Sequence, residues 1–152
     1  GEASHVELGT YLRSLMHNIA EEFADDGREL ALHLELAEAS VDVDIAMPVG
    51  LILTELASNS FIHAWKTSRP GCLSVVLEVH ERQAPDPARS GRMLELRIAD
   101  EGDTSVDFAR LGLGLELVGE LAGQIDADLS YLADTGSVFR LEFYAEKRPQ
   151  DT

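Results

Sequence analysis

Residues 49–65, VGLILTELASNSFIHAW, are mostly apolar and predict a helix that the rest of the chain must cover. Glu55, Asn59 and His63 recur along it every four residues, so they form a row along one side. The side next to this row is mostly apolar and is expected to face the core. Polar groups beside a buried surface are costly unless something binds them. The pattern therefore predicts that this helix forms one wall of a ligand site.

The composition is that of one globular domain, and we expect residues 1–152 to fold as a unit. The chain has 152 residues, of which 45% are hydrophobic and 26% charged. The formal net charge of −16 argues against nucleic acid or an anionic membrane as a partner. A ligand that carries phosphates would need local compensation from a metal ion, backbone N–H groups or a helix N-terminus.

Cys72 is the only cysteine, so neither an intrachain disulfide nor a cysteine metal cluster can form. This fits a reducing, cytoplasmic location. The longest apolar run, residues 49–53, is far shorter than the ~20 residues of a membrane span. The N-terminus has acidic Glu2 and no long apolar core, unlike a signal peptide. Because the chain starts within what looks like helical sequence, we expect a fragment of a longer protein.

The periodicity of apolar residues predicts three helices and five main strands. Helices are expected at residues 6–24, from Asp44 or Pro48 to the breaker at 68–71, and at 113–122. Strands are expected at residues 30–36, 73–80, 93–99, 129–132 and 137–144, with a short extended piece at 41–44. Hairpin connections between most strands indicate a two-layer α/β (α+β) sandwich, with a mixed sheet and all three helices on one face.

Several local features carry expectations of their own. Ser4 with Glu7 has the spacing of a capping box for the first helix. Asp44 is a candidate cap for the central helix, and Pro48 is expected only in a first turn. His80, at the edge of a loop rich in proline, is expected to be solvated.

Each polar group of the central helix has a chemistry that suits a bound phosphate compound. A carboxylate at Glu55 can orient or deprotonate a nucleophile that attacks a phosphoryl group. The amide oxygen of Asn59 can ligate Mg²⁺, which prefers oxygen. His63, one turn further on, can reach a phosphate oxygen.

Two later stretches complete such a site. Asp100-Glu101-Gly102 follows a predicted strand, where the first carboxylate can accept a hydrogen bond from an exocyclic amine such as that of adenine. Gly112-Leu113-Gly114-Leu115 opens a helix, and its glycines let phosphate oxygens approach free N–H groups. It is not a Walker P-loop, since no Gly-Lys-Ser/Thr follows. Each stretch is weak alone, but the three together favour a nucleotide site.

In this order the stretches resemble the ATP-binding catalytic domain of sensor histidine kinases, in the superfamily shared with DNA gyrase, heat-shock chaperones and mismatch-repair ATPases. Residues 55–59, ELASN, with His63 resemble its N box, and Asp100-x-Gly102 its first glycine box. Residues 112–118, GLGLELV, resemble its second glycine box, and residues 136–139, GSVF, its closing strand. The likeness spans residues 6–144 and is strongest to the light-activated and HWE-type branch.

The resemblance implies the Bergerat fold and a role for each matching residue. Asn59 would hold Mg²⁺, and Glu55 occupies the position of a general base in related ATPases. Asp100 would bind the adenine amine with help from Ser137, and Gly102 would pack beside the ring. The residues implied to bind the nucleotide are Asn59, His63, Asp100, Gly102, Gly112, Leu113, Gly114, Leu115 and Ser137.

The function implied is binding of Mg-ATP and supply of its γ-phosphate to a histidine on a separate dimerisation domain of the same kinase. A response regulator would act downstream, and the full-length protein would be a homodimer. Two alternatives share the same motifs. The domain could have lost ATP and serve as a docking module in a phosphotransfer pathway, or it could be a serine kinase of the anti-sigma-factor type.

The chain departs from the family pattern at four places. Thr104 replaces the second glycine of the first glycine box, and Ile62 stands where this branch usually has lysine. Asp126-Ala127 replaces a Gly-Gly pair after the third helix. The segment between the two glycine boxes is short, and Arg110 is its only cation.

Overall fold

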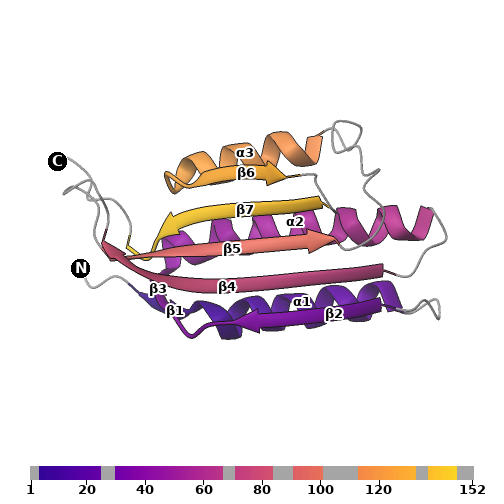
Figure 1. Ribbon diagram of the computed structural model, residues 1–152, viewed down its shortest axis with the longest axis horizontal. Coiled ribbons are helices and arrows are strands. Elements are labelled where there is room, and N and C mark those ends of the chain that lie inside the picture. The colour runs from indigo at the N-terminus through magenta and orange to yellow at the C-terminus, as the bar shows by residue number, and fades with distance from the viewer. Residues whose placement is uncertain are drawn as a thin grey trace.

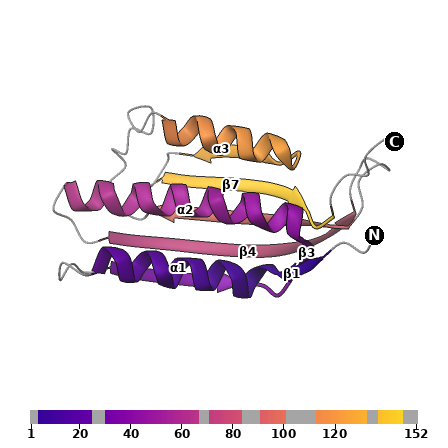
Figure 2. The same cartoon turned by 180° about the vertical axis from the view of Figure 1, so that it is seen from behind.

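The computed structural model describes residues 4–24, 30–66, 71–83, 91–100, 113–132 and 137–146. Five strands form a sheet in the order β2-β4-β5-β7-β6, and three helices cover one of its faces (Figures 1 and 2). The elements in chain order are β1 (His5–Glu7), α1 (Leu8–Ala24), β2 (Leu30–Leu36), β3 (Ser40–Asp42), α2 (Val43–Lys66), β4 (Gly71–Gln83), β5 (Arg92–Asp100), α3 (Leu113–Gln124), β6 (Asp128–Leu132) and β7 (Ser137–Tyr144).

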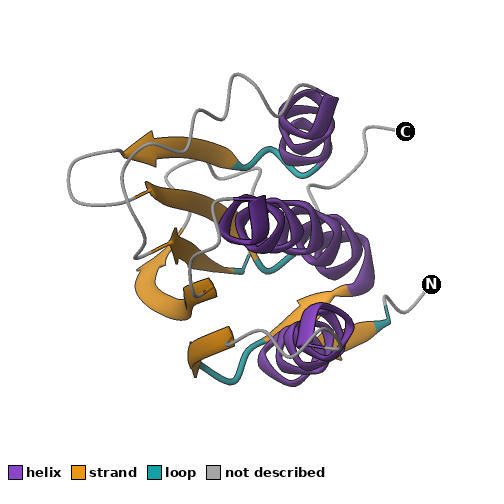
Figure 3. Ribbon diagram, turned by 90° about the vertical axis from the view of Figure 1, so that its right-hand side faces the viewer, coloured by secondary structure: helices purple, strands orange, loops and turns teal. Residues whose placement is uncertain are grey.

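The sheet is mixed, as predicted. β2 pairs with β4 in parallel, while the pairs β4–β5, β5–β7 and β6–β7 are antiparallel. The side view shows the sheet as one layer and the helices as the other (Figure 3). The two-layer α+β sandwich with three helices on one face is therefore confirmed.

α2 supplies the centre of the core. Ile52, Leu53 and Ala57 are fully buried, and they belong to one apolar cluster with Leu96 and Ile98 of β5. In length and composition, Val43–Ile62 also passes as a membrane-spanning helix, with a mean hydropathy of 1.4. Over half of that window, 56%, is buried inside the domain, as expected of a helix covered by a sheet and two other helices.

The first helix begins later than predicted, and Ser4 does not cap it. His5–Glu7 form β1, which pairs antiparallel with β3, so this part of the chain is extended. The N–H of Val43 donates to the carbonyl of Ser4 at 2.9 Å. The N–H of Thr10 instead donates to Oε2 of Glu7 at 2.6 Å, which makes Glu7 the capping residue.

The start of α2 also differs from the prediction. Oδ1 of Asp42 accepts the N–H of Asp44 at 3.0 Å, so Asp42 is the cap and Asp44 lies in the first turn. Pro48 is buried inside the helix rather than in its first turn. Since proline has no N–H, the helix continues past one missing backbone hydrogen bond.

The strands match the predicted ranges closely, with one consequence for His80. β2 and β7 have the predicted bounds, while β4 extends to Gln83. His80 therefore lies within a strand, and its side chain is only 30% exposed. The expectation of a solvated histidine was wrong, because the strand continues past the residue where the loop was expected to begin.

Gly9 allows α1 to lie against the turn after β2, and we predict that Gly9→Ala destabilises the domain. A Cβ at this position would lie 2.5 Å from the carbonyl oxygen of Ala37, a backbone atom that cannot turn aside. We expect a loss of about 1–3 kcal/mol in the free energy of unfolding, measured by urea denaturation.

Gly119→Ala is the matched control for this prediction. A Cβ at Gly119, on the exposed side of α3, would meet nothing within 4 Å. This variant should gain about 0.5–1 kcal/mol, because alanine favours a helix interior. Equal stability of the two variants would contradict the close contact at Gly9.

Candidate functional site

Four segments that are distant in sequence meet at one end of the sheet. The C-terminal end of α2, the end of β5, the start of α3 and the start of β7 lie together there in both views (Figures 1 and 2). The pairing of the strands agrees, since Leu73, near the start of β4, is opposite Asp100 at the end of β5. The described parts of the two later stretches thus lie at the same end of the domain as the C-terminal end of α2.

Asp100 and Ser137 are neighbours on adjacent strands. They are Cα partners in the antiparallel pair formed by β5 and β7, at the last residue of one strand and the first of the other. Asp100 is half-buried. The structure thus brings together the carboxylate and the hydroxyl residue to which the resemblance assigns the adenine amine.

Asn59 carries a buried polar group with no partner in the part of the chain that the structure describes. Its Nδ2 is inaccessible to solvent and makes no hydrogen bond with the described residues. An unsatisfied buried donor costs about 1–3 kcal/mol, so an acceptor oxygen from a ligand would recover that energy. If the side-chain amide rotates by about 180°, Oδ1 takes the place of Nδ2, and this oxygen suits Mg²⁺. This side chain therefore fits the predicted Mg-ATP.

The other polar residues of α2 keep the predicted spacing. Glu55 is half-buried one turn before Asn59 on the same helix. His63 lies on the last turns of the helix, but its side chain is outside the described part of the structure. Ile62 is half-buried just before it, so this position of the wall supplies no positive charge.

The start of α3 offers backbone groups for an anion. Leu113 is the first residue of the helix, and the first N–H groups of a helix have no partner within it. Together with the helix dipole, these groups make such a terminus suitable for phosphate. Gly114 and Leu115 follow within the first turn. Gly102, Thr104, Arg110 and Gly112 lie outside the described residues.

The departure at Asp126-Ala127 belongs to the other end of α3. Asp126 has a φ of 52°, the left-handed conformation that usually requires glycine. The N–H of Ala127 donates to the carbonyl of Ala122, and that of Asp126 to the carbonyl of Gly123, a pattern that closes the helix. The replacement of Gly-Gly by Asp126-Ala127 therefore affects how α3 ends, about 18 Å from the start of the helix.

We predict that Asn59→Ala leaves the ligand-free domain as stable as the wild type or more stable. The substitution removes the unsatisfied donor and places a stronger helix former in α2. We expect no loss of unfolding free energy in urea without nucleotide, and a gain of up to about 1 kcal/mol. Leu56→Ala, in the same helix and 1% exposed, is the control and should lose about 2–5 kcal/mol. A clear destabilisation by Asn59→Ala would mean that the amide has a structural partner.

No family model matches the chain, and no curated protein does. Similar solved structures include three that are each less than 25% identical to this chain. The histidine kinase domain of a blue-light activated histidine kinase from Erythrobacter litoralis is 21% identical, with a TM-score of 0.71, over 92% of this chain and 62% of that one. The catalytic domain of the histidine kinase ThkA is 16% identical, with a TM-score of 0.70, over 97% and 100%.

A third similar structure is full-length ShkA in complex with AMPPNP, at 19% identity and a TM-score of 0.64 over 97% of this chain and 32% of that one. The chain spans 62% of the kinase domain from Erythrobacter litoralis and 46% of a longer chain of the same kinase. The chain therefore has the fold of histidine kinase catalytic domains, as its sequence resemblance implies.

Proposed function

We propose that this domain binds Mg-ATP and supplies the γ-phosphate for phosphorylation of a histidine on a separate dimerisation domain in two-component signalling. The observation that carries the proposal is the buried Nδ2 of Asn59 on α2, which has no hydrogen-bond partner among the described residues. This helix leads to the end of the sheet where Asp100 and Ser137 pair. A domain that bound nothing there would gain stability by losing that amide.

Each part of the nucleotide has a counterpart among the residues at this end. Asp100 and Ser137 would hold the adenine amine, and the N–H groups that open α3 would hold phosphate oxygens. Asn59 would hold Mg²⁺, which offsets the negative charge of the phosphates when bound. That offset matters in a chain with a net charge of −16. Glu55 would orient the attacking group one turn along the same helix.

The proposal needs components that lie outside this domain. The phosphoacceptor histidine would belong to the dimerisation domain of a homodimeric, cytoplasmic kinase, and a response regulator would take the phosphate. Full-length ShkA was solved with AMPPNP, which supports a nucleotide as the ligand of this fold. Isolated, the domain is expected to bind nucleotide but to autophosphorylate little.

Isothermal titration calorimetry with Mg-ATP tests the proposal directly. The wild-type domain should bind one nucleotide, with an affinity that falls when EDTA removes Mg²⁺. Asn59→Ala should weaken binding at least tenfold and abolish the dependence on Mg²⁺. Asp100→Ala should weaken ATP about 10–100-fold, because a hydrogen bond to a charged group is worth about 1.5–3 kcal/mol. It should leave binding of inorganic triphosphate unchanged.

His33→Ala is the control for these titrations, because His33 is exposed on β2, a strand that does not contribute to the site. It should bind like the wild type. Absence of binding at millimolar Mg-ATP, or equal binding by wild type and Asn59→Ala, would contradict the proposal.

The second candidate is a docking module that has lost ATP, and the apolar Ile62 on the wall of the site favours it. The two candidate functions predict different effects of site mutations on signalling by the full-length protein. In the full-length protein, Asn59→Ala with Asp100→Ala should abolish histidine phosphorylation if the domain is a kinase. Normal signalling by that double variant would instead favour docking. The matched full-length His33→Ala protein should signal normally in either case.

A further inference from the structure

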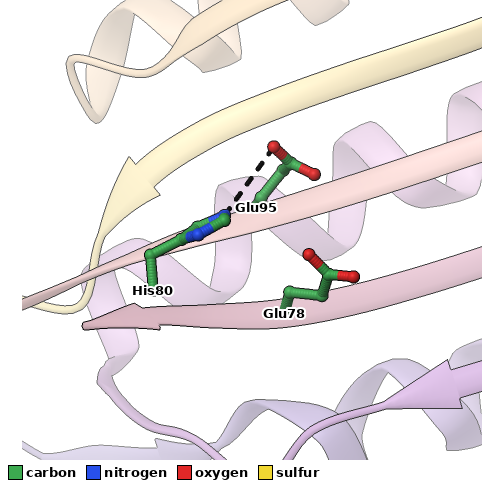
Figure 4. Close-up of side chains that lie close together, drawn as sticks. All are labelled: Glu78, His80 and Glu95. Carbon is green, nitrogen blue, oxygen red and sulfur yellow. Dashed lines mark ion pairs between the residues drawn. The ribbon is translucent and has the colours of Figure 1, made fainter. Parts of the chain in front are cut away.

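The face of the sheet away from the helices holds a cluster formed by Glu78, His80 and Glu95 (Figure 4). The residues that alternate with them, Leu77, Leu94 and Leu96, belong to the core on the helix side. Glu95 lies five residues before Asp100 on β5, about 17 Å along the strand. The cluster is therefore separate from the proposed nucleotide site.

Two negative charges face each other in this cluster. Glu78 and Glu95 are directly opposite in the β4–β5 pair, an arrangement that is unfavourable for like charges. Arg97 bridges them, with 2.8 Å from its Nη1 to Oε2 of Glu95 and 2.7 Å from its Nη2 to Oε1 of Glu78. One guanidinium balances one of the two carboxylates. These three side chains together keep a charge of −1, and Glu95 is only 7% exposed. On β7, Glu142 lies opposite Glu95 and is paired with Arg140 at 3.6 Å, so that pair leaves the sum unchanged.

The imidazole of His80 lies within ion-pair distance of Glu95 but makes no hydrogen bond to it (Figure 4). Its Nε2 is inaccessible to solvent and makes no hydrogen bond with the described residues. The nearest carboxylate atom, Oε1 of Glu95, is 3.7 Å away, too far for a hydrogen bond. Two ligand atoms of one tetrahedral zinc ion, each at about 2.1 Å, lie about 3.4 Å apart. The distance of 3.7 Å between Nε2 of His80 and Oε1 of Glu95 is thus close to that between two ligand atoms of one metal ion.

We propose that Glu78, His80 and Glu95 bind a divalent transition metal ion of the zinc class. One ligand atom from each residue lies within 4.8 Å of the other two, so small side-chain movements close the site. An imidazole nitrogen among the ligands favours Zn²⁺ over Mg²⁺ or Ca²⁺. Arg97 donates a hydrogen bond to one oxygen of each carboxylate and so orients it, as groups around metal ligands commonly do.

Such an ion would link β4 and β5 on the face of the sheet away from the helices, about 17 Å along β5 from Asp100. Because it would bind the folded state alone, it would raise the free energy of unfolding with the logarithm of its concentration once that concentration exceeds Kd. The competing occupant is a proton on His80, which would give an imidazolium beside Glu95. The two occupants differ in their response to added metal.

The test is a titration of the tag-free, EDTA-treated domain with Zn²⁺, by calorimetry and by thermal unfolding. We expect one saturable site, a rise in Tm with Zn²⁺ but not with equimolar Mg²⁺, and a shift of the His80 ring signals in NMR. His80→Ala should bind Zn²⁺ at least tenfold more weakly and lose the rise in Tm. Its affinity for Mg-ATP should be that of the wild type.

His33→Ala is the matched control, because Nε2 of His33 also lies near a carboxylate, Oε1 of Glu35 at 2.9 Å, but both side chains are more than 60% exposed. It should keep the zinc site. If His80→Ala does not fold, His80→Gln replaces it. The shift of the His80 ring signals with Zn²⁺ is measured on the native domain and does not depend on any variant. Absence of saturable binding, or zinc binding unchanged by the loss of His80, would overturn the proposal.

Discussion

The structure depends on the packing of α2 between the sheet and the two other helices. Ile52, Leu53 and Ala57 are fully buried in the core, and this contact sets where the helix lies. Glu55 and Asn59 are on the same helix and are only half-buried, so their positions are determined by the packing of their neighbours. The core and the candidate site are therefore built on one rigid element, which suits a site that must hold its groups in place.

The two faces of the sheet have different chemistry. The helix-covered face supplies the core and, at the end where Asp100 pairs with Ser137, the proposed nucleotide site. The opposite face carries charged residues that interact across strands, where Arg97 connects Glu78 with Glu95. Because the two regions are about 17 Å apart along β5, a change in one can be made without altering the other. That separation makes the two proposals independent.

The sequence predicted the sheet, the helices and most strand ends, because periodicity reports which side of each element is buried. It misassigned the caps at Ser4 and Asp44, since the pairing of β1 with β3 joins residues far apart in sequence. The position of Asp100 beside Ser137 followed from family resemblance, whereas the cluster at His80 was missed. Its members meet only through the cross-strand register of Glu78 and Glu95, which sequence spacing does not reveal.

The most direct test of the central claim is an NMR map of the domain titrated with Mg-AMPPNP. The backbone amide signals of Asn59, Asp100, Ser137 and Leu113–Leu115 should shift together and saturate with one ligand. The amide signals of Glu78, His80 and Glu95 should stay in place. Shifts confined to another surface, or no shifts at millimolar nucleotide, would contradict a nucleotide site at this end of the sheet.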